Sequence, residues 1–352
     1  MSIHRIPALI DVHVHLREPG STHKEDYDTG TAAALAGGVT TVLDMPNTDP
    51  PTTDGVTLMA KRSLARRKIR CDVRLFLGGT SSNAQEVARL APQAVGLKLY
   101  LNQSYGPLRL QGLPSLLGHM RAWPRGKPIT VHAEGATLAQ AIALAWAFDQ
   151  RLHCCHVSRR VEVELIAAAK ARGAPLTCEV TPHHLFLTRA DAARLGSLAD
   201  MRPPLGTSKD QAALWEHLET AIDCVASDHA PHTLAEKQGP NSPPGVPGLE
   251  TMLPLLLTGV AKGRLSLERL VQLVVENPAR IFGLSILEDQ VEVEIGPKWV
   301  LPERGYFTRC DWSPFSGMQV RGRVLRTTLR GRMAYADGQI LAPLGSGRVL
   351  FS

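Results

Sequence analysis

Short apolar runs alternate with segments of helical composition along most of this chain of 352 residues, and this alternation limits the possible folds more than any other feature. Segments 31–38, 136–150 and 161–173 have helical composition. Strand–helix alternation indicates a parallel sheet, and eight apolar runs favour a closed (β/α)8 TIM barrel. A doubly wound open sheet is the alternative, but no glycine-rich fingerprint follows the first run. The expected strands are at 8–16, 40–45, 72–78, 95–101, 128–134, 152–157, 175–180 and 221–230.

The end of the chain has a different pattern. From about residue 290, short stretches of strand composition follow one another, and Asp337-Gly338 is typical of a hairpin turn. We therefore predict two domains: a catalytic barrel of residues 8–285, and a small β appendage of residues 286–352 to which residues 1–7 add one strand. The appendage strands are expected in VEVEI, KWVLP, VRGRVLRTTLRG and MAYADGQIL.

The composition describes a folded protein with a basic surface. Apolar residues make up 44%, which allows a large core and excludes a disordered chain. The formal charge of +6 suits an anionic substrate, an acidic partner or nucleic acid. No nucleic-acid-binding motif supports the last, so we expect no such partner. Basic clusters at 61–70 and 320–332 are expected to be solvated faces, with a docking surface for another domain as the alternative.

Cysteines and apolar segments indicate the compartment. The six cysteines have no framework spacing and most lie in apolar runs, which is typical of buried thiols in a reducing compartment. No apolar run is long enough to span a membrane, and the polar N-terminus does not resemble a signal peptide. We therefore expect a soluble cytoplasmic protein that does not bind membranes.

Side chains that bind metals occur at the carboxyl ends of several expected strands. His13 and His15 lie on one strand, and their imidazoles point to the same face because side chains alternate with a period of two. His132, His156 and Asp228 lie at the ends of the fifth, sixth and eighth strands. These ends meet at one face of a barrel, and imidazole and carboxylate groups suit zinc or a similar divalent ion. One such histidine alone would usually be structural, but the whole set predicts a metal site.

Lys98 is unusual because it lies within the apolar run Val95–Tyr100. A buried ammonium group is unfavourable unless it is paired or neutralised, and here it would also face a metal. Carbamylation by carbon dioxide would give it a negative charge and two oxygens that can bridge two metals. The alternative is a lysine that reaches the barrel mouth or pairs with a carboxylate.

Several short motifs are spread over nearly the whole chain: HVHLREPG (13–20), MPNT (45–48), GLKLYL (96–101), VHAE (131–134), CHVS (155–158), TPHH (181–184) and SDHAPH (227–232). Together they resemble the dihydroorotases of the amidohydrolase superfamily, and the combination is highly specific. The segments CEVTPHHLFL, SDHAPHT, PGLETMLPLLLT and NPARIFGL look most like the dihydroorotase domain of the CAD-type multifunctional pyrimidine-synthesis polyprotein.

The resemblance implies a centre of two zinc ions bridged by a hydroxide. The first zinc would have the ligands His13, His15, Asp228 and carbamylated Lys98, and the second would have Lys98, His132 and His156. The CAD-type relatives also resemble this chain at Cys155 and Glu179, where a third zinc is associated with the site. The alternatives are a buried small hydrophobe for Cys155 and a hydrogen-bond partner of a ligand for Glu179. Structural or indirect roles are expected for His183, His184 and His229.

Substrate-binding residues are also implied by the resemblance. Arg17, Asn47 and His232 match the family's binders of the substrate carboxylate, and a planar guanidinium suits a carboxylate. The alternative for Arg17 is a salt bridge to Glu18 or Asp44.

Two loops are expected to meet the substrate as well. The family folds a mobile loop over the substrate, which here is 102–106 with Ser104 and Tyr105 where CAD-type relatives typically have Thr-Phe. Gly248 would contact the substrate through its backbone, and Arg202 completes the substrate-binding candidates.

The activity that the resemblance implies is that of a dihydroorotase. This enzyme reversibly cyclises N-carbamoyl-L-aspartate to L-dihydroorotate plus water in de novo pyrimidine biosynthesis, and Asp228 would be the general acid and base. The alternatives are another cyclic amidohydrolase (allantoinase, hydantoinase or dihydropyrimidinase) and a non-catalytic dihydroorotase-like scaffold. Arg17 with Asn47 disfavours hydantoinase and dihydropyrimidinase, whose substrates mostly lack a ring carboxylate. The complete ligand set disfavours the scaffold.

The resemblance also suggests partners other than the substrate. We expect a homodimer, with linked or docked carbamoyl-phosphate synthetase and aspartate transcarbamoylase units. The chain would be either an excised domain or a free-standing enzyme.

Overall fold

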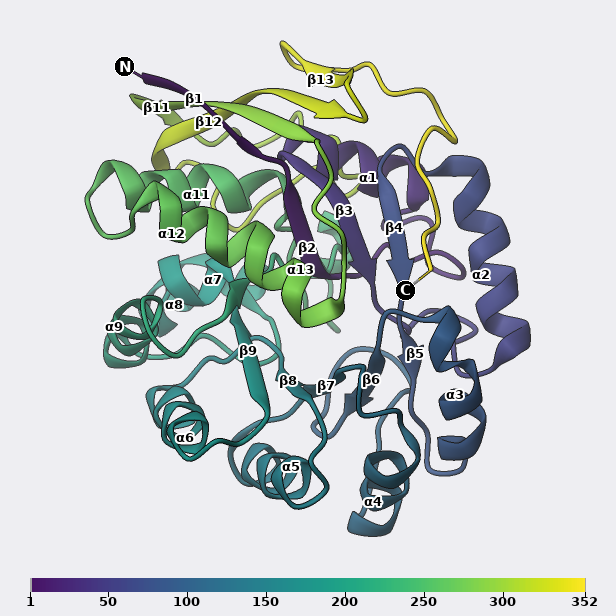
Figure 1. The fold of residues 1–352 in the computed structure, drawn as a ribbon. Helices are drawn as coiled ribbons and strands as arrows, with labels where there is room; N and C mark the ends of the chain where they lie inside the picture. The colour runs from purple at the N-terminus through teal and green to yellow at the C-terminus, as the bar shows by residue number, and fades with distance from the viewer. Residues whose placement is uncertain (1, 352) are drawn as a thin grey trace.

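The computed structural model describes residues 2–351, and two parallel sheets form a barrel at its centre (Figure 1). One sheet has the strand order β2-β3-β4, and the other has the order β10-β9-β8-β7-β6-β5. The barrel strands are β2 (Leu9–Val14), β3 (Val39–Asp44), β4 (Asp72–Leu75), β5 (Leu77–Gly78), β6 (Leu97–Tyr100), β7 (Ile129–His132), β8 (Leu152–Cys154), β9 (Leu176–Val180) and β10 (Cys224–Val225).

Backbone hydrogen bonds join the two sheets at both seams. The third expected strand is broken at Phe76 into β4 and β5, and the Val95 amide, just before β6, donates to the Leu75 carbonyl oxygen of β4 (3.0 Å). At the other seam, Val14 pairs in parallel with His229, and the His15 amide donates to the His229 carbonyl oxygen (2.8 Å). The ring of strands is therefore closed, which confirms the predicted (β/α)8 class.

Helices cover the outside of the barrel (Figure 1). Side-chain caps fix several of their starts: in α2, the Asp54 carboxylate accepts from the Thr57 amide (2.8 Å), and basic residues occupy the last turn. The helices are α1 (Tyr27–Ala36), α2 (Gly55–Lys68), α3 (Ala84–Leu90), α4 (Leu113–Ala122), α5 (Gly135–Ala147), α6 (Arg160–Ala171), α7 (Pro182–Phe186), α8 (Arg189–Leu195), α9 (Ser208–His217), α10 (Leu234–Gln238), α11 (Leu249–Ala261), α12 (Leu267–Val271) and α13 (Asn277–Phe282).

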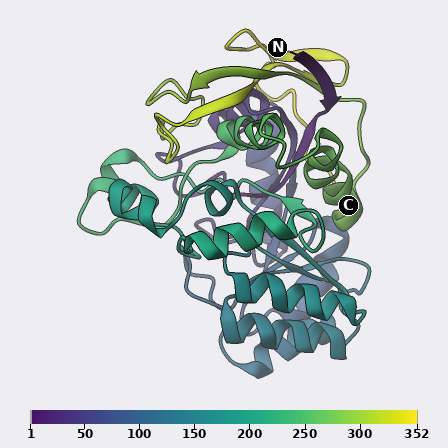
Figure 2. The same cartoon turned by 90° about the vertical axis from the view of Figure 1, so that its left-hand side faces the viewer.

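A five-stranded antiparallel sheet lies over one side of the barrel (Figure 2). Its order is β1-β11-β12-β13-β14, so the N-terminal strand joins the C-terminal segment as expected. The stretches VEVEI and KWVLP do not form separate strands: they belong to one strand with an irregularity between Ile295 and Trp299. The strands are β1 (Ser2–Pro7), β11 (Gln290–Val300), β12 (Gln319–Leu329), β13 (Arg332–Ala336) and β14 (Gln339–Ile340).

The sheet and the barrel pack closely. Gly322 of β12 makes this possible, since a Cβ atom there would lie 2.2 Å from the Cβ of Leu257 in α11. Asp337 and Gly338 both have positive φ (50° and 77°), as the predicted hairpin turn requires. The exact boundary between barrel and appendage stays a prediction.

Two other expectations concern the whole chain. All six cysteines are free and buried, as predicted. Within residues 2–351, none of the helices combines the length and the apolar character needed to cross a membrane.

Candidate metal and substrate site

The predicted ligand side chains meet at the carboxyl ends of the barrel strands. Asp228 is the meeting point of the first group: its Oδ1 lies 3.4 Å from His13 Nε2 and 3.2 Å from His15 Nε2. These three residues offer donor atoms within 4.8 Å of one another. All the predicted ligands are buried: His13, His15, Lys98, His132, Cys155, His156, Glu179 and Asp228.

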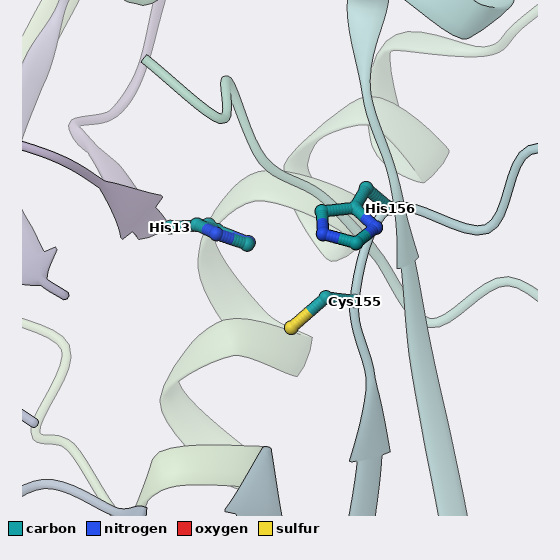
Figure 3. A group of neighbouring side chains, drawn as sticks. All are labelled: His13, Cys155 and His156. Carbon is teal, nitrogen blue, oxygen red and sulfur yellow. The ribbon is translucent and has the colours of Figure 1, made fainter. Parts of the chain in front are cut away.

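A second group shares His13 with the first. Figure 3 shows His13 from β2 pointing across the barrel toward Cys155 and His156, which follow β8. The donor atoms of these three side chains also lie within 4.8 Å of one another. His132, the last residue of β7, lies next to them, with its Nδ1 2.9 Å from His156 Nε2. The barrel therefore brings together donors from strands far apart in the sequence.

Lys98 of β6 is completely buried beside this second group. Its Nζ donates to Cys155 Sγ (2.8 Å) and lies 5.2 Å from the centre of the Tyr100 ring. In the described part of the chain, Lys98 forms no ion pair with a carboxylate and does not reach solvent. Both alternatives considered for this lysine therefore fail.

Two of these histidines each have a second ring nitrogen that is free to bind a metal. His132 Nε2 and His156 Nδ1 are buried and have no hydrogen-bond partner within residues 2–351. Such orphaned donors are unfavourable unless something absent from a protein-only structure pairs with them. Burial lowers the pKa of all four predicted imidazole ligands, which keeps them in the neutral form that binds metals: His13, His15, His132 and His156.

Glu179 of β9 contacts two of the predicted ligands, His13 and His156. Its carboxylate pairs with His13 Nδ1, lies 3.0 Å from His153 Nε2, and accepts from the His156 amide (3.2 Å). These partners hold the pKa of Glu179 well below its usual range, although burial opposes them. This arrangement gives Glu179 a hydrogen-bonding role toward His13 and His156.

Three residues of this site have a strained backbone. Arg17, His156 and Asp228 adopt positive φ angles of 59°, 33° and 44°, which are unfavourable for side chains other than glycine. Such conformations persist only where the surrounding structure enforces them, and they are frequent at functional sites.

A cationic pocket lies beside the ligands. Arg17 Nη2 is 3.1 Å from His232 Nε2, and Arg17 Nε donates to the Pro231 carbonyl oxygen (3.1 Å). Arg17 therefore does not form the alternative salt bridge to a neighbouring acid. Asn47 Oδ1 lies 2.7 Å from His15 Nδ1, which connects the pocket to the first ligand group.

The loop 102–106 closes this pocket. The Tyr105 ring lies 4.9 Å from the Arg17 guanidinium carbon, and its backbone oxygen accepts from Asn47 Nδ2 (3.0 Å). Ser104 also lines the pocket, whose free volume is only about 20 Å³. A cavity of this size holds about one water molecule, so a ring-shaped substrate does not fit the pocket in this conformation.

Sequence reasoning missed two residues at this site, Lys24 beside the pocket and His183 in its lining. Lys24 is buried, and its Nζ donates to Tyr105 Oη (2.9 Å) and lies 3.0 Å from His232 Nδ1. It lies in a polar stretch whose composition gives no sign of burial. His183, expected to be structural, lines the pocket with an unpartnered Nε2, whereas His184 is bonded to Thr181 and Pro203.

Two predicted substrate residues are placed differently. The Gly248 amide already donates to His229 Nδ1 (3.2 Å), and Gly245 and Val246 line the pocket in its place. Arg202 reaches the pocket mouth but pairs with Asp200.

Sequence comparison agrees with this geometry. A profile of the amidohydrolase family matches residues 5–289. The chain is 49% identical to the multifunctional protein CAD of Squalus acanthias over 98% of its own length, but it spans only 15% of that protein. It is 36% identical to a dihydroorotase of Pyrococcus abyssi, and the alignment covers 98% of this chain and 87% of the archaeal protein.

Solved structures show the same fold. An L-hydantoinase (dihydropyrimidinase) from Arthrobacter aurescens is similar with a TM-score of 0.93 and 28% identity, over 99% of this chain and 89% of the other. An inactive dihydroorotase-like domain of a Chaetomium thermophilum CAD-like multifunctional protein is similar with a TM-score of 0.86 and 29% identity, over 99% and 100% of the two chains. Structural similarity alone therefore does not separate active relatives from an inactive one.

Proposed function

Since the chain belongs to the amidohydrolase family and, within it, to the dihydroorotases, we propose that it reversibly cyclises N-carbamoyl-L-aspartate to L-dihydroorotate and water. One observation carries the proposal: the buried ligand cluster lies directly beside groups that suit a carboxylate. His15 joins the two parts, because it contacts Asp228 on one side (3.2 Å) and Asn47 on the other (2.7 Å). One pocket can therefore hold both the reacting amide and the carboxylate of the substrate.

We propose zinc as the resident metal, because the donors are imidazoles and a carboxylate and two imidazole nitrogens have no partner in the described chain. When bound, zinc polarises the amide carbonyl and provides a nucleophile at neutral pH. A third ion is proposed at Cys155, near Glu179, because Cys155 faces His13 and His156. The proposed ligands of the other two ions are His13, His15, Lys98, His132, His156 and Asp228.

Lys98 is proposed to act as its carbamate. The neutral amine would add to carbon dioxide, so that an N–C bond forms and one proton is released. This reaction replaces a buried cation, which faces four imidazoles and has no carboxylate partner in the described chain, by an anion with two oxygens. The burial of Lys98 supports this proposal, since an uncompensated ammonium is unfavourable there.

Arg17, Asn47 and His232 are proposed to hold the substrate carboxylate. The guanidinium and the His232 ring already lie 3.1 Å apart, so they can contact the same anion. Opening of the loop at Ser104 and Tyr105 would admit the substrate, and its closure would exclude water. Arg202 at the mouth and the Gly248 backbone are proposed for weaker or indirect contacts.

Asp228 is proposed to move the proton. In ring opening, its carboxylate accepts the proton of the attacking water and delivers it to the departing ring nitrogen; ring closure reverses these steps. The position of Asp228 against His13 and His15, in an enforced φ of 44°, supports this role because it fixes the carboxylate at the ligand cluster.

The setting of the reaction is also a proposal. We propose a cytoplasmic enzyme that forms homodimers and works beside carbamoyl-phosphate synthetase and aspartate transcarbamoylase units. The similarity to a multifunctional protein of which this chain spans 15% supports such neighbours.

The test is turnover of L-dihydroorotate by the purified chain with added zinc and bicarbonate. We expect ring opening by the wild type, a loss of about 10²- to 10⁴-fold in Asp228→Asn, and no loss in the exposed control Asp149→Asn. Dihydrouracil, which lacks the carboxylate, should react with a kcat/KM lower by about 10²-fold or more. Preference for dihydrouracil would indicate another cyclic amidohydrolase, and inactivity toward all cyclic amides would indicate the scaffold.

A further inference from the structure

A buried ion pair lies behind the carboxylate pocket and has no part in the chemistry described so far. Lys61 in the middle of α2 and Asp44 at the end of β3 are both completely buried, and Lys61 Nζ lies 2.8 Å from Asp44 Oδ2. Removing such charges from water is unfavourable, and a buried pair is weak evidence for stability by itself. Its presence therefore calls for another explanation.

The partners of the pair indicate what it does. Asp44 Oδ1 accepts from the Leu16 amide (3.0 Å), and Asp44 Oδ2 also accepts from Tyr27 Oη (3.2 Å). Lys61 Nζ donates to the Met45 carbonyl oxygen (2.7 Å). One network therefore holds the backbone at two points: at Leu16, one residue before Arg17, and at Met45, two residues before Asn47.

Both segments need such support. Arg17 has a positive φ of 59°, a conformation that side chains rarely adopt and that its surroundings must enforce. Asn47 follows a turn that β2 also supports, since the Met45 amide donates to the Val14 carbonyl oxygen (2.9 Å). The Lys61 side chain adds a second attachment at the Met45 carbonyl oxygen. The network ties these two turns to the same helix.

We propose that Lys61 and Asp44 are positioning residues that set the spacing between Arg17 and Asn47, and so determine selectivity for substrates with a ring carboxylate. This inference rests on the proposed function. Neither side chain touches the substrate pocket; each acts through the backbone that carries a carboxylate-binding residue.

The first test is Lys61→Met, which keeps the unbranched side chain one atom shorter and removes its charge. We expect KM for L-dihydroorotate to rise about tenfold while kcat stays within about threefold and bound zinc is unchanged, because the interaction lost is with a part of the substrate that does not react. The matched control is Lys170→Met, which removes another lysine–aspartate pair, with Asp223 before β10. The control should lower thermal stability without changing KM.

A milder variant covers the case in which Lys61→Met does not fold. Tyr27→Phe removes only the hydroxyl that donates to Asp44 and should raise KM by about two- to threefold. An unchanged KM in Tyr27→Phe and in folded Lys61→Met, or an equal rise in the Lys170→Met control, would overturn the proposal.

A measurement without substrate separates this proposal from the proposed function. Amide hydrogen exchange should quicken in segments 14–20 and 45–48 of Lys61→Met relative to Lys170→Met. If the wild type fails to open L-dihydroorotate, the proposed function fails, while the exchange result still tests the positioning role. Unchanged exchange in both segments would refute positioning even in an active enzyme.

Discussion

Lys98 is the single residue whose chemistry matters most to this account. Lys98 is buried, lies near four imidazoles and contacts Cys155 Sγ at 2.8 Å, and its ammonium forms no ion pair with a carboxylate in the described chain. A carbamate would resolve this conflict, and the same conflict could be seen in the sequence, since a lysine inside an apolar run is unusual. Lys24 and Lys61 carried no such signal, because only tertiary contacts show that they are buried.

Substitution of Lys98 tests the carbamate. Lys98→Ala should lose bound metal and lower turnover by at least about 100-fold. Loss of a residue that only hydrogen-bonds to a metal ligand already lowers metal affinity or activity by about 10- to 100-fold. Short carboxylic acids such as acetate should restore part of the bound metal and part of the turnover, because their oxygens replace those of the carbamate. Acetate should not accelerate the wild type. Full zinc content and full turnover in Lys98→Ala would show that the bridging role is wrong.

Among the elements, α11 is connected to the loop that follows β11 through Glu250 in its first turn. Its carboxylate accepts from the Phe307 amide (3.1 Å) and the Thr308 amide (3.0 Å). Burial raises the pKa of Glu250 to about 8, although these two donors oppose the shift. The folded chain therefore holds a proton there that the unfolded chain releases above its ordinary pKa of 4.5.

This difference predicts how stability depends on pH. Because the native state binds more protons between the two pKa values, the free energy of unfolding should fall as pH rises from about 5 to 8.5, by up to about 4 kcal/mol. The side chain in the Glu250→Gln variant cannot ionise. The free energy of unfolding of this variant should therefore be lower than that of the wild type at pH 5, but it should change less as pH rises. Urea unfolding checks this, with exposed Glu268→Gln as the control. Equal slopes for Glu250→Gln and the wild type would contradict the assignment.

The order of the elements could be predicted better than their ends. Eight apolar runs were enough for the barrel, because strand–helix alternation allows few other arrangements. The break at Phe76 and the two-residue β10 could not be predicted, since both result from how the ring of strands closes. The bond between the Gly248 amide and His229 could not be predicted for a similar reason, since this contact depends on tertiary structure.

At the scale of the whole molecule, the closed barrel creates the site. Residues from His13 to Asp228 meet only because the strands between them form a ring, and strand ends in the sequence were enough to predict the meeting. The C-terminal segment returns to the barrel, where Val349 pairs with Val73 of β4 and Arg330 pairs with buried Asp72 (2.6 Å). The sequence did not predict this return, because nothing in the composition of the segment indicates its partner.

The central claim is that this ring of side chains binds the metal on which ring opening of L-dihydroorotate depends. The most direct measurement is turnover of L-dihydroorotate by metal-free protein as zinc is added in steps with bicarbonate, with bound metal determined at each step. We expect no turnover without metal, and a rise in parallel with bound zinc that saturates at two or three ions per chain. Turnover in the metal-free protein, or none in a fully loaded one, would contradict it.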